Sequence, residues 1–222
     1  VALGSAGKLT LNMASYMGRY DIAIYDSEQK RIWNTYEYLD ENATMRQDAY
    51  GLYLEEGIYY ILIYKDSDKG TGVYKLSASF VSSHTTFSGD DNSAVNARPI
   101  GFGSTYKGQL SLNDDYDTYK FSVAAGRNIP VSFRSNMRTY TIKVYDAAGK
   151  SVWTQDPDYY SGWSESSNSR KDSYTVTLSA GTYYMEVSRR SDWTGTYEFS
   201  LGNGELTSLK LSKKSLKLVK GD

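Results

Sequence analysis

Acidic side chains gather in two short segments and form the clearest chemical candidate in the sequence. They are Asp90, Asp91 and Asn92, followed by Asp114, Asp115 and Asp117. Calcium prefers six to eight oxygen ligands from carboxylates, amides and carbonyls, and the two segments could supply them if they meet at one end of a folded domain. The alternative is that Asp114 and Asp115 form a solvated turn, while Asp117 bonds nearby backbone amides.

The second candidate is a group of aromatic residues in the last third of the chain. It consists of Tyr159, Tyr160, Trp163 and Trp193. Exposed Tyr and Trp offer a large, rigid contact area at low entropic cost, which suits sugar rings or a triple-helical peptide. The alternative is that these rings only cap the end of a domain, since the chain holds 22 tyrosines.

The sequence contains few of the residue types that commonly carry out catalysis. Cysteine is absent and His84 is the only histidine, which leaves no set for a thiol or Ser-His-Asp hydrolase. Paired carboxylates for glycoside hydrolysis need a defined separation across a cleft, whereas Glu55-Glu56 and Asp40-Glu41 are adjacent residues in expected turns. We therefore predict that the chain is not an enzyme and has no catalytic residues.

Charge and hydropathy exclude two further classes of partner. The 222 residues include 25 Lys and Arg against 26 Asp and Glu, a formal net charge of −1. Nucleic-acid binding requires clustered positive charge, and a spanning helix requires about 20 apolar residues in succession. We expect neither nucleic-acid binding nor membrane insertion.

The chain contains an internal duplication, because residues 15–33 align with residues 135–153 without a gap. The identical pairs are Ser15/Ser135, Met17/Met137, Tyr20/Tyr140, Ile22/Ile142, Tyr25/Tyr145, Asp26/Asp146, Lys30/Lys150 and Trp33/Trp153. A second stretch, around Gly57 and Gly181, repeats as well. Two homologous domains follow, with Trp33 and Trp153 expected in their cores.

Both repeats show the alternation of apolar and polar residues that is typical of strands. Ile129, Val131 and Phe133 illustrate it, with polar residues or proline between them. We predict an all-β chain of two tandem jelly-roll-like β-sandwiches. Val1 aligns with Phe121, so the first sandwich lacks its N-terminal strands and has sheet edges that another segment would have to cover.

The expected domain boundaries follow from this alignment and from a Ser/Thr/Gly/Asp-rich stretch between the repeats. They are a first sandwich over 1–82, a linker over 83–91, a second sandwich over 92–203, and a C-terminal stretch over 204–222.

Short motifs in the two repeats resemble a known family. They are Asn92-Ser93-Ala94, Gly108-Gln109-Leu110, Asp115 to Phe121, Tyr145-Asp146, Gly181 to Tyr184 and Gly195-Thr196-Tyr197, with Tyr25-Asp26, Gly57 to Tyr60 and Gly72 to Tyr74 in the first repeat. This pattern resembles tandem bacterial pre-peptidase C-terminal domains. Residues 206–222 are similar to the opening strands of a bacterial Ig-like group 2 domain.

The resemblance implies an accessory module of a secreted or cell-surface bacterial protein, in a family whose members include calcium binders. The calcium-binding relatives place their ligands in the linker and in an acidic loop, which correspond here to Asp90, Asp91, Asn92, Asp115 and Asp117. The expected partners are an extracellular protein or polysaccharide and neighbouring domains of a larger chain. Two alternatives stay open: a purely structural stalk, or accessory domains of a secreted peptidase or glycosidase.

Overall fold

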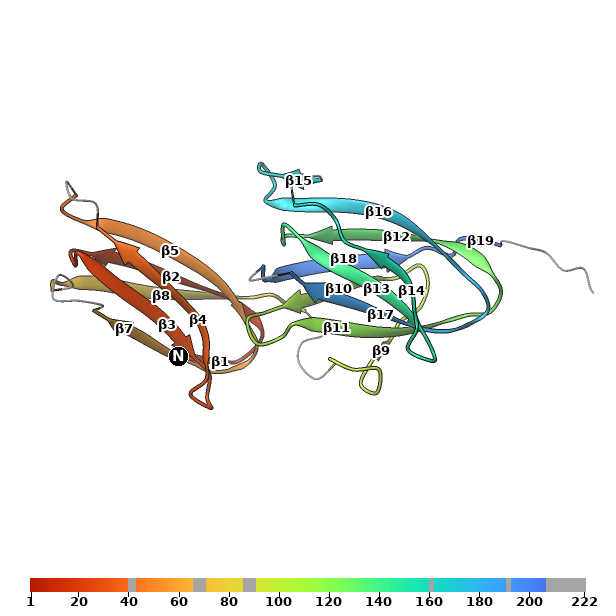
Figure 1. Ribbon diagram of the computed structural model, residues 1–222, viewed down its shortest axis with the longest axis horizontal. Coiled ribbons are helices and arrows are strands. Elements are labelled where there is room, and N and C mark those ends of the chain that lie inside the picture. Colours follow the sequence, from red (N-terminus) through yellow and green to blue (C-terminus); the bar gives the residue numbers. More distant parts are fainter. Residues whose placement is uncertain (40–42, 66–70, 86–90, 160–161, 191–192, 207–222) are drawn as a thin grey trace, which may run out of the picture.

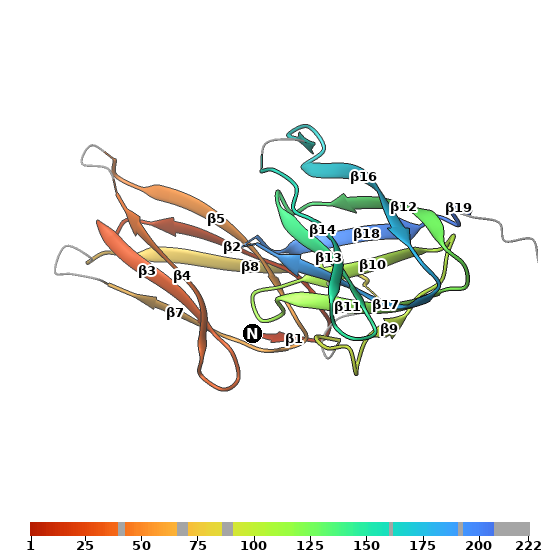
Figure 2. The ribbon, with the colours of Figure 1, turned by 45° about the vertical axis from the view of Figure 1, so that its right-hand side comes forward.

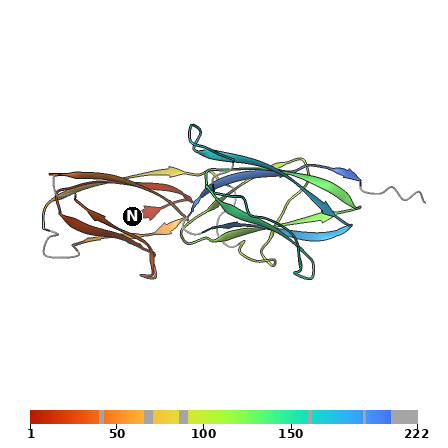
Figure 3. The ribbon, with the colours of Figure 1, turned by 45° about the horizontal axis from the view of Figure 1, so that its top comes forward.

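The computed structural model describes residues 1–39, 43–65, 71–85, 91–159, 162–190 and 193–206. Every regular element in these residues is a β-strand, and the strands form two groups that lie end to end (Figure 1). Each group has two layers, which are seen most clearly in Figure 3. The predicted all-β fold of two sandwiches is confirmed.

The first sandwich pairs two three-stranded antiparallel sheets. One sheet has the order β5 (Arg46–Leu54), β2 (Gly7–Ser15), β8 (Tyr74–Ser82); the other has the order β4 (Arg31–Tyr38), β3 (Arg19–Tyr25), β7 (Tyr60–Tyr64). A short pair, β1 (Ala2–Leu3) with β6 (Gly57–Ile58), lies at one end.

The second sandwich has wider sheets. One has the order β10 (Thr105–Leu110), β18 (Gly195–Leu201), β12 (Arg127–Ser135), β16 (Ser169–Leu178), β15 (Trp163–Ser164), with β19 (Glu205–Leu206) also beside β12. The other has the order β14 (Ser151–Gln155), β13 (Tyr140–Asp146), β17 (Gly181–Arg189), β11 (Tyr116–Val123), β9 (Arg98–Pro99). All these pairs are antiparallel except β9 with β11.

Alternation along the strands builds each core. In β12 the side chains of Ile129, Val131 and Phe133 are buried, and the residues between them are exposed. Because successive side chains of a strand point to opposite faces, this pattern places one face of the sheet against the other sheet. The core of the second sandwich is a single cluster, whereas the first sandwich has two smaller ones.

Equivalent hairpins show how the duplication is preserved in local structure. In the first sandwich Oδ1 of Asp26 accepts hydrogen bonds from the amides of Glu28 and Lys30. Asp146 makes the same two bonds in the second sandwich. An aspartate that accepts from amides two and four residues later closes the β3–β4 and β13–β14 turns.

The two sandwiches meet through the turn that links β10 to β11 (Figure 2). The amide of Leu112 donates to the carbonyl of Tyr53 at 3.1 Å. Nε2 of Gln109, which is fully buried, donates to the carbonyl of Leu54 at 3.0 Å and to Oε1 of Glu55 at 3.1 Å. The junction is therefore formed by the end of β10 and by the following turn, which also carries Asp114. It combines these hydrogen bonds with the Leu112 side chain, which packs against the core of the first sandwich.

Candidate metal centre

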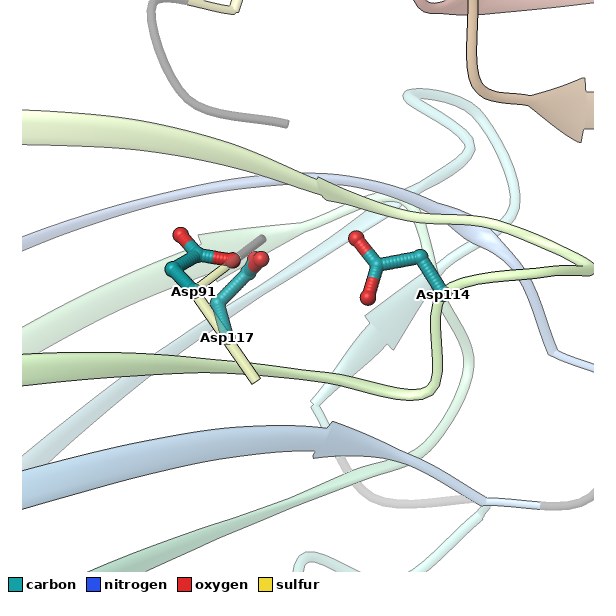
Figure 4. Close-up of side chains that lie close together, drawn as sticks. All are labelled: Asp91, Asp114 and Asp117. Carbon is teal, nitrogen blue, oxygen red and sulfur yellow. The ribbon is translucent and has the colours of Figure 1, made fainter. Parts of the chain in front are cut away.

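Three carboxylates converge inside the second sandwich, near its junction with the first. Asp91 lies before β9, Asp114 in the turn between β10 and β11, and Asp117 in β11. One oxygen from each lies within 4.8 Å of the others, and Figure 4 shows the three carboxylates directed toward one another. Their exposed fractions are 1%, 2% and 0%.

Backbone hydrogen bonds hold the three residues in place. Ser111 and Asp114 pair through their backbones, which closes the turn and turns Asp114 inward. The amide of Thr118 donates to the carbonyl of Asp91 at 3.1 Å, so the segment before β9 is fixed against β11. Asp117 shares the inward face of β11 with Tyr119 and Phe121 because the side-chain period of a strand is two.

Positive charge and hydrogen-bond donors compensate the cluster only in part. Nε of Arg98 donates to Oδ2 of Asp91 at 2.7 Å, and the phenol of Tyr197 donates to Oδ2 of Asp117. The Tyr197 and Tyr119 hydroxyls are also hydrogen-bonded, at 2.6 Å. Oδ1 of Asp91 and Oδ1 of Asp117 are buried and have no hydrogen-bond partner in the described part of the chain.

The electrostatics of the cluster favour a proton or a cation. Burial, followed by the charges of Asp91 and Asp114, raises the pKa of Asp117 well above its usual value. Burial, followed by the charge of Asp117, also raises the pKa of Tyr197, so its phenol stays protonated as a donor. Buried carboxylates that are not fully paired must be protonated or must coordinate a metal.

The donor set fits a hard divalent cation. All ligands on offer are oxygens, and the neighbouring Asn92 adds a buried amide oxygen, Oδ1, without a hydrogen-bond partner among the described residues. Oxygen-only coordination is the preference of calcium and magnesium, whereas zinc favours histidine and cysteine. The buried aspartates could therefore bind a metal.

The structure places only some of the predicted acidic residues in one cluster. It brings Asp91 and Asp117 together and leaves Asn92 next to Asp91. Asp115 lies apart from them: its side chain is 66% exposed and its Oδ1 accepts from Nε of Arg189 at 2.8 Å. Asp90 lies outside the described residues.

Asp114 belongs to the acidic segment considered for calcium, but it is missing from the five ligands that the family resemblance implies. The expected turn forms, but the Asp114 carboxylate is buried in it. The alternation Asp117, Tyr119, Phe121 could have shown that Asp117 points into the core. No comparable pattern marks Asp114, because a turn has no fixed period.

Three of the predicted aromatic residues converge around an arginine that the sequence analysis did not consider. The guanidinium of Arg138 lies over the rings of Tyr159, Trp163 and Trp193, at 5.3, 5.1 and 5.8 Å from their centroids. The Tyr159 and Trp193 rings are themselves 5.7 Å apart. Tyr160 lies outside the described residues.

The cluster of Arg138, Tyr159, Trp163 and Trp193, called here the aromatic cluster, is half-buried and carries charge at its rim. Nη2 of Arg138 bonds Oε1 of Glu165 at 2.9 Å. Stacking on a cation is worth about 0.5–1 kcal/mol for each exposed contact, so Arg138 holds the three rings in one place. That the cluster binds a ligand stays a prediction.

Of the two carboxylate pairs considered for catalysis, the structure describes Glu55 and Glu56, and these two side chains lie in different surroundings. Glu55 is buried at the junction beside Gln109, whereas Glu56 is exposed. His84 is exposed. Asp40 and Glu41 lie outside the described residues.

No protein-family profile matches the chain. It is 23% identical over 181 residues to collagenase ColQ1 of Bacillus cereus (strain Q1), a match that covers 79% of this chain and 18% of that protein. It thus spans less than a fifth of the length of that curated relative.

Two solved structures are also similar. The pre-peptidase C-terminal domain of a collagenase from Bacillus anthracis is 25% identical, with a TM-score of 0.37, and the match covers 47% of this chain and 93% of that one. The insecticidal delta-endotoxin Cry8Ea1 of Bacillus thuringiensis is 8% identical, with a TM-score of 0.29, over 91% of this chain and 54% of that one. No helix in the described ranges is long and apolar enough to cross a membrane. By the comparison with the Bacillus anthracis structure, the chain has a region similar to the pre-peptidase C-terminal domain of a bacterial collagenase.

Proposed function

We propose that this chain is a non-catalytic accessory module of a secreted or cell-surface bacterial protein, and that its second sandwich binds calcium through Asp91, Asp114 and Asp117. The single observation that carries the metal site is the burial of three carboxylates whose nearest oxygens lie within 4.8 Å of one another. Calcium would neutralise charge that burial otherwise makes unfavourable.

A calcium ion at this place has a mechanical consequence for the module. It would join three segments: the residues before β9, the turn between β10 and β11, and β11 itself. Backbone carbonyls, Oδ1 of Asn92 and water would complete a shell of six to eight oxygens. The ion would act as a structural clamp on the second sandwich and would take part in no reaction.

Thermal unfolding tests the clamp. A ligand that binds only the folded state raises its stability by about 2.7 kcal/mol at a free concentration 100 times its Kd. We expect calcium to raise the Tm of the wild-type chain relative to chelator, and Asp114→Asn to lose that increase. Asp115→Asn is the matched control, since Asp115 is exposed and paired with Arg189. Coincident curves with calcium and chelator for the wild type would reject the site.

Similarity to a collagenase supports the accessory role. The match covers 18% of that protein, so a chain of this kind can be one part of a much longer polypeptide. The sequence has one histidine and no cysteine. We propose that catalysis, where it occurs, resides in another domain of the parent chain and that the sandwiches attach that domain to an extracellular protein or polysaccharide.

The aromatic cluster is the proposed attachment site. Two of its rings, Tyr159 and Trp163, come from one short segment, and the third, Trp193, lies 30 residues beyond Trp163; all three meet on Arg138. Aromatic rings beside an arginine suit both stacked sugar rings and the pyrrolidine rings of extended peptides. Co-sedimentation with collagen fibrils and with insoluble polysaccharides distinguishes these ligands.

A double variant, Tyr159→Ala with Trp163→Ala, should lose most of the bound fraction in that assay. Tyr60→Ala, at an exposed tyrosine of the first sandwich, is the matched control and should bind as the wild type does. Binding that survives the double variant would place attachment elsewhere. A wild-type chain that binds none of these materials would favour a structural stalk.

A further inference from the structure

A row of charged side chains crosses the outward face of one sheet in the second sandwich. In this sheet β10, β18, β12 and β16 lie side by side (Figure 1). Lys107 of β10 is in register with Glu198 of β18, and Glu198 is in register with Arg134 of β12. Arg134 is in turn in register with Lys171 of β16. Because neighbouring strands lie about 4.8 Å apart, the four residues form a row about 14 Å long.

A second row, made only of hydroxyl side chains, lies next to the charged row. It crosses the same four strands in register and consists of Thr105, Ser200, Ser132 and Ser173. These hydroxyls make no hydrogen bond with any residue that the structure describes. Both rows face away from the core, since Phe133 and Phe199, which alternate with them along β12 and β18, are buried. The face therefore presents hydroxyl groups beside charged groups.

The two rows line two hollows that join into one trough. The first hollow has a volume of about 390 Å³ and contains Lys107, at one end of the charged row. The second has a volume of about 330 Å³ and contains Lys171, at the other end, together with the whole hydroxyl row. Arg134 and Glu198 line both hollows. The surface formed by the charged row and the hydroxyl row is called here the polar trough.

The polar trough has an excess of positive charge. Arg134 and Lys171 are like charges directly opposite each other on neighbouring strands, an arrangement that destabilises a sheet. Nη1 of Arg134 lies 3.8 Å from Oε1 of Glu198, and this exposed ion pair offsets little of the charge. Lys107 and Lys171 form no ion pair with any residue in the described ranges. An anion bound between these cations would neutralise the excess.

The duplication shows that the fold itself does not require the charged row. In the aligned repeats Ala14 takes the place of Arg134. The partners of Ala14 across β5 and β8 are Gln47 and Lys75, so the equivalent row of the first sandwich has a single cation. The row beside it consists of Asn12, Ala49 and Ser77 and has a single hydroxyl. Both the cations and the hydroxyls are therefore particular to the second sandwich.

We propose that the polar trough binds an acidic polysaccharide, a linear sugar chain that carries carboxylate or sulfate groups. Its three cations would form charge-assisted hydrogen bonds with the acidic groups of the chain. The hydroxyl row would bond sugar hydroxyls, which both donate and accept, and Glu198 would accept from a sugar hydroxyl between two acidic groups. The trough shares no residue with the aromatic cluster, so this binding goes beyond the attachment proposed there.

The same surface suits a nucleic acid less well. A nucleic-acid strand carries one phosphate about every 3.4 Å, which would place phosphates against the Glu198 carboxylate in the middle of the row. Binding of single strands also relies on bases that stack on aromatic rings. None of the exposed aromatic residues in the described part of the chain lies on β10, β18, β12 or β16. The chemistry of the trough therefore favours a sugar polymer with spaced acidic groups.

Affinity electrophoresis in gels that contain heparin, polygalacturonate or dextran tests the proposal. Chelator is present throughout, so the result does not depend on the proposed calcium site. We expect heparin or polygalacturonate to slow the wild-type chain, and uncharged dextran to leave its mobility unchanged. The triple variant Lys107→Ala, Arg134→Ala, Lys171→Ala should raise the Kd for the acidic polymer by roughly tenfold or more, because it removes three charge-assisted contacts.

Two further variants separate a specific site from general attraction between opposite charges. Lys30→Ala, Lys75→Ala, Lys150→Ala removes three exposed lysines outside the trough, and therefore the same charge, and should keep the wild-type affinity. Glu198→Gln should bind the acidic polymer more tightly, because it removes the negative charge from the row and keeps an oxygen acceptor. A gain of affinity cannot come from misfolding.

The proposal is overturned if neither acidic polysaccharide slows the wild-type chain, or if the trough and control triple variants lose affinity equally. Single-stranded DNA that binds as tightly as the polysaccharide, with a loss in the trough variant, would assign the trough to nucleic acid instead. Polysaccharide binding that is lost in Tyr159→Ala with Trp163→Ala but kept in the trough variant would assign it to the aromatic cluster.

Discussion

Tyr197 of β18 donates a hydrogen bond from its phenol to the carboxylate of Asp117 in β11, and both side chains are buried. The bond joins the two sheets of the second sandwich across its core. It also gives the acidic cluster a donor that is independent of any metal.

Removing that donor should weaken the second sandwich. Tyr197→Phe leaves an Asp117 oxygen buried with less compensation, which costs about 1–3 kcal/mol. Urea unfolding in the presence of chelator measures the change. Tyr184→Phe, in which the phenol lies on the outward side of β17, should alter the free energy of unfolding by much less. Equal effects of the two substitutions would contradict the role of the Tyr197–Asp117 bond.

The raised pKa of Asp117 makes stability and metal binding depend on pH in opposite directions. Without metal, the protonation of Asp117 stabilises the folded state. This contribution to the free energy of unfolding is fully present below the pKa of an unfolded aspartate, about 3.9, and is lost as pH rises through the raised pKa of folded Asp117. Calcium needs the ionised carboxylate, so its affinity should fall as pH falls through the same window. Asp117→Asn should remove this contribution from the pH dependence of the metal-free chain. An unchanged stability profile in that variant would contradict the assignment.

The junction between the sandwiches gives a third prediction. Gln109→Ala removes the donor to Leu54 and Glu55, both of which lie in the first sandwich. We expect the two sandwiches to become less fixed relative to each other, seen as a broader range of particle dimensions in small-angle X-ray scattering. Gln47→Ala, at an exposed glutamine of β5, is the control and should leave the scattering unchanged.

A duplicated arginine network allows a direct comparison of burial. Arg170 bonds Asp172 and Arg46 bonds Asp48, each with 2.7 Å between Nε and Oδ2. The Arg170 side chain is 0% exposed, whereas that of Arg46 is 34% exposed. Arg170→Met should destabilise its sandwich by about 3–5 kcal/mol because it leaves the partly buried Asp172 carboxylate without its cation and with only the Tyr140 hydroxyl as a donor.

Arg46→Met should cost about 1 kcal/mol, because water reaches the same pair in the first sandwich. Chemical unfolding that resolves the two sandwiches measures both costs. A larger loss for Arg46→Met than for Arg170→Met would show that burial does not set the strength of the network.

Much of the fold could be predicted from local pattern. Alternation in β12 and the matched Asp26 and Asp146 turns depend only on neighbouring residues, so the sequence shows them directly. The lack of two strands in the first sandwich followed from aligning Val1 with Phe121. Pairing partners and register depend on contacts between distant segments, and only the structure places them.

The candidate sites were predictable in kind but not in membership. Asp91 and Asp117 were expected, but the inward turn of Asp114 depends on its backbone pairing with Ser111. Arg138 could not be anticipated as the centre of the aromatic cluster, because it is distant in the sequence from both the Tyr159–Trp163 segment and Trp193.

Calorimetric titration of calcium into the chelator-treated chain at neutral pH tests the central claim most directly. The predicted result is one saturable site per chain, retained in Asp115→Asn and lost in Asp117→Asn. Absence of binding to the wild type, or binding that Asp117→Asn leaves unchanged, would contradict it.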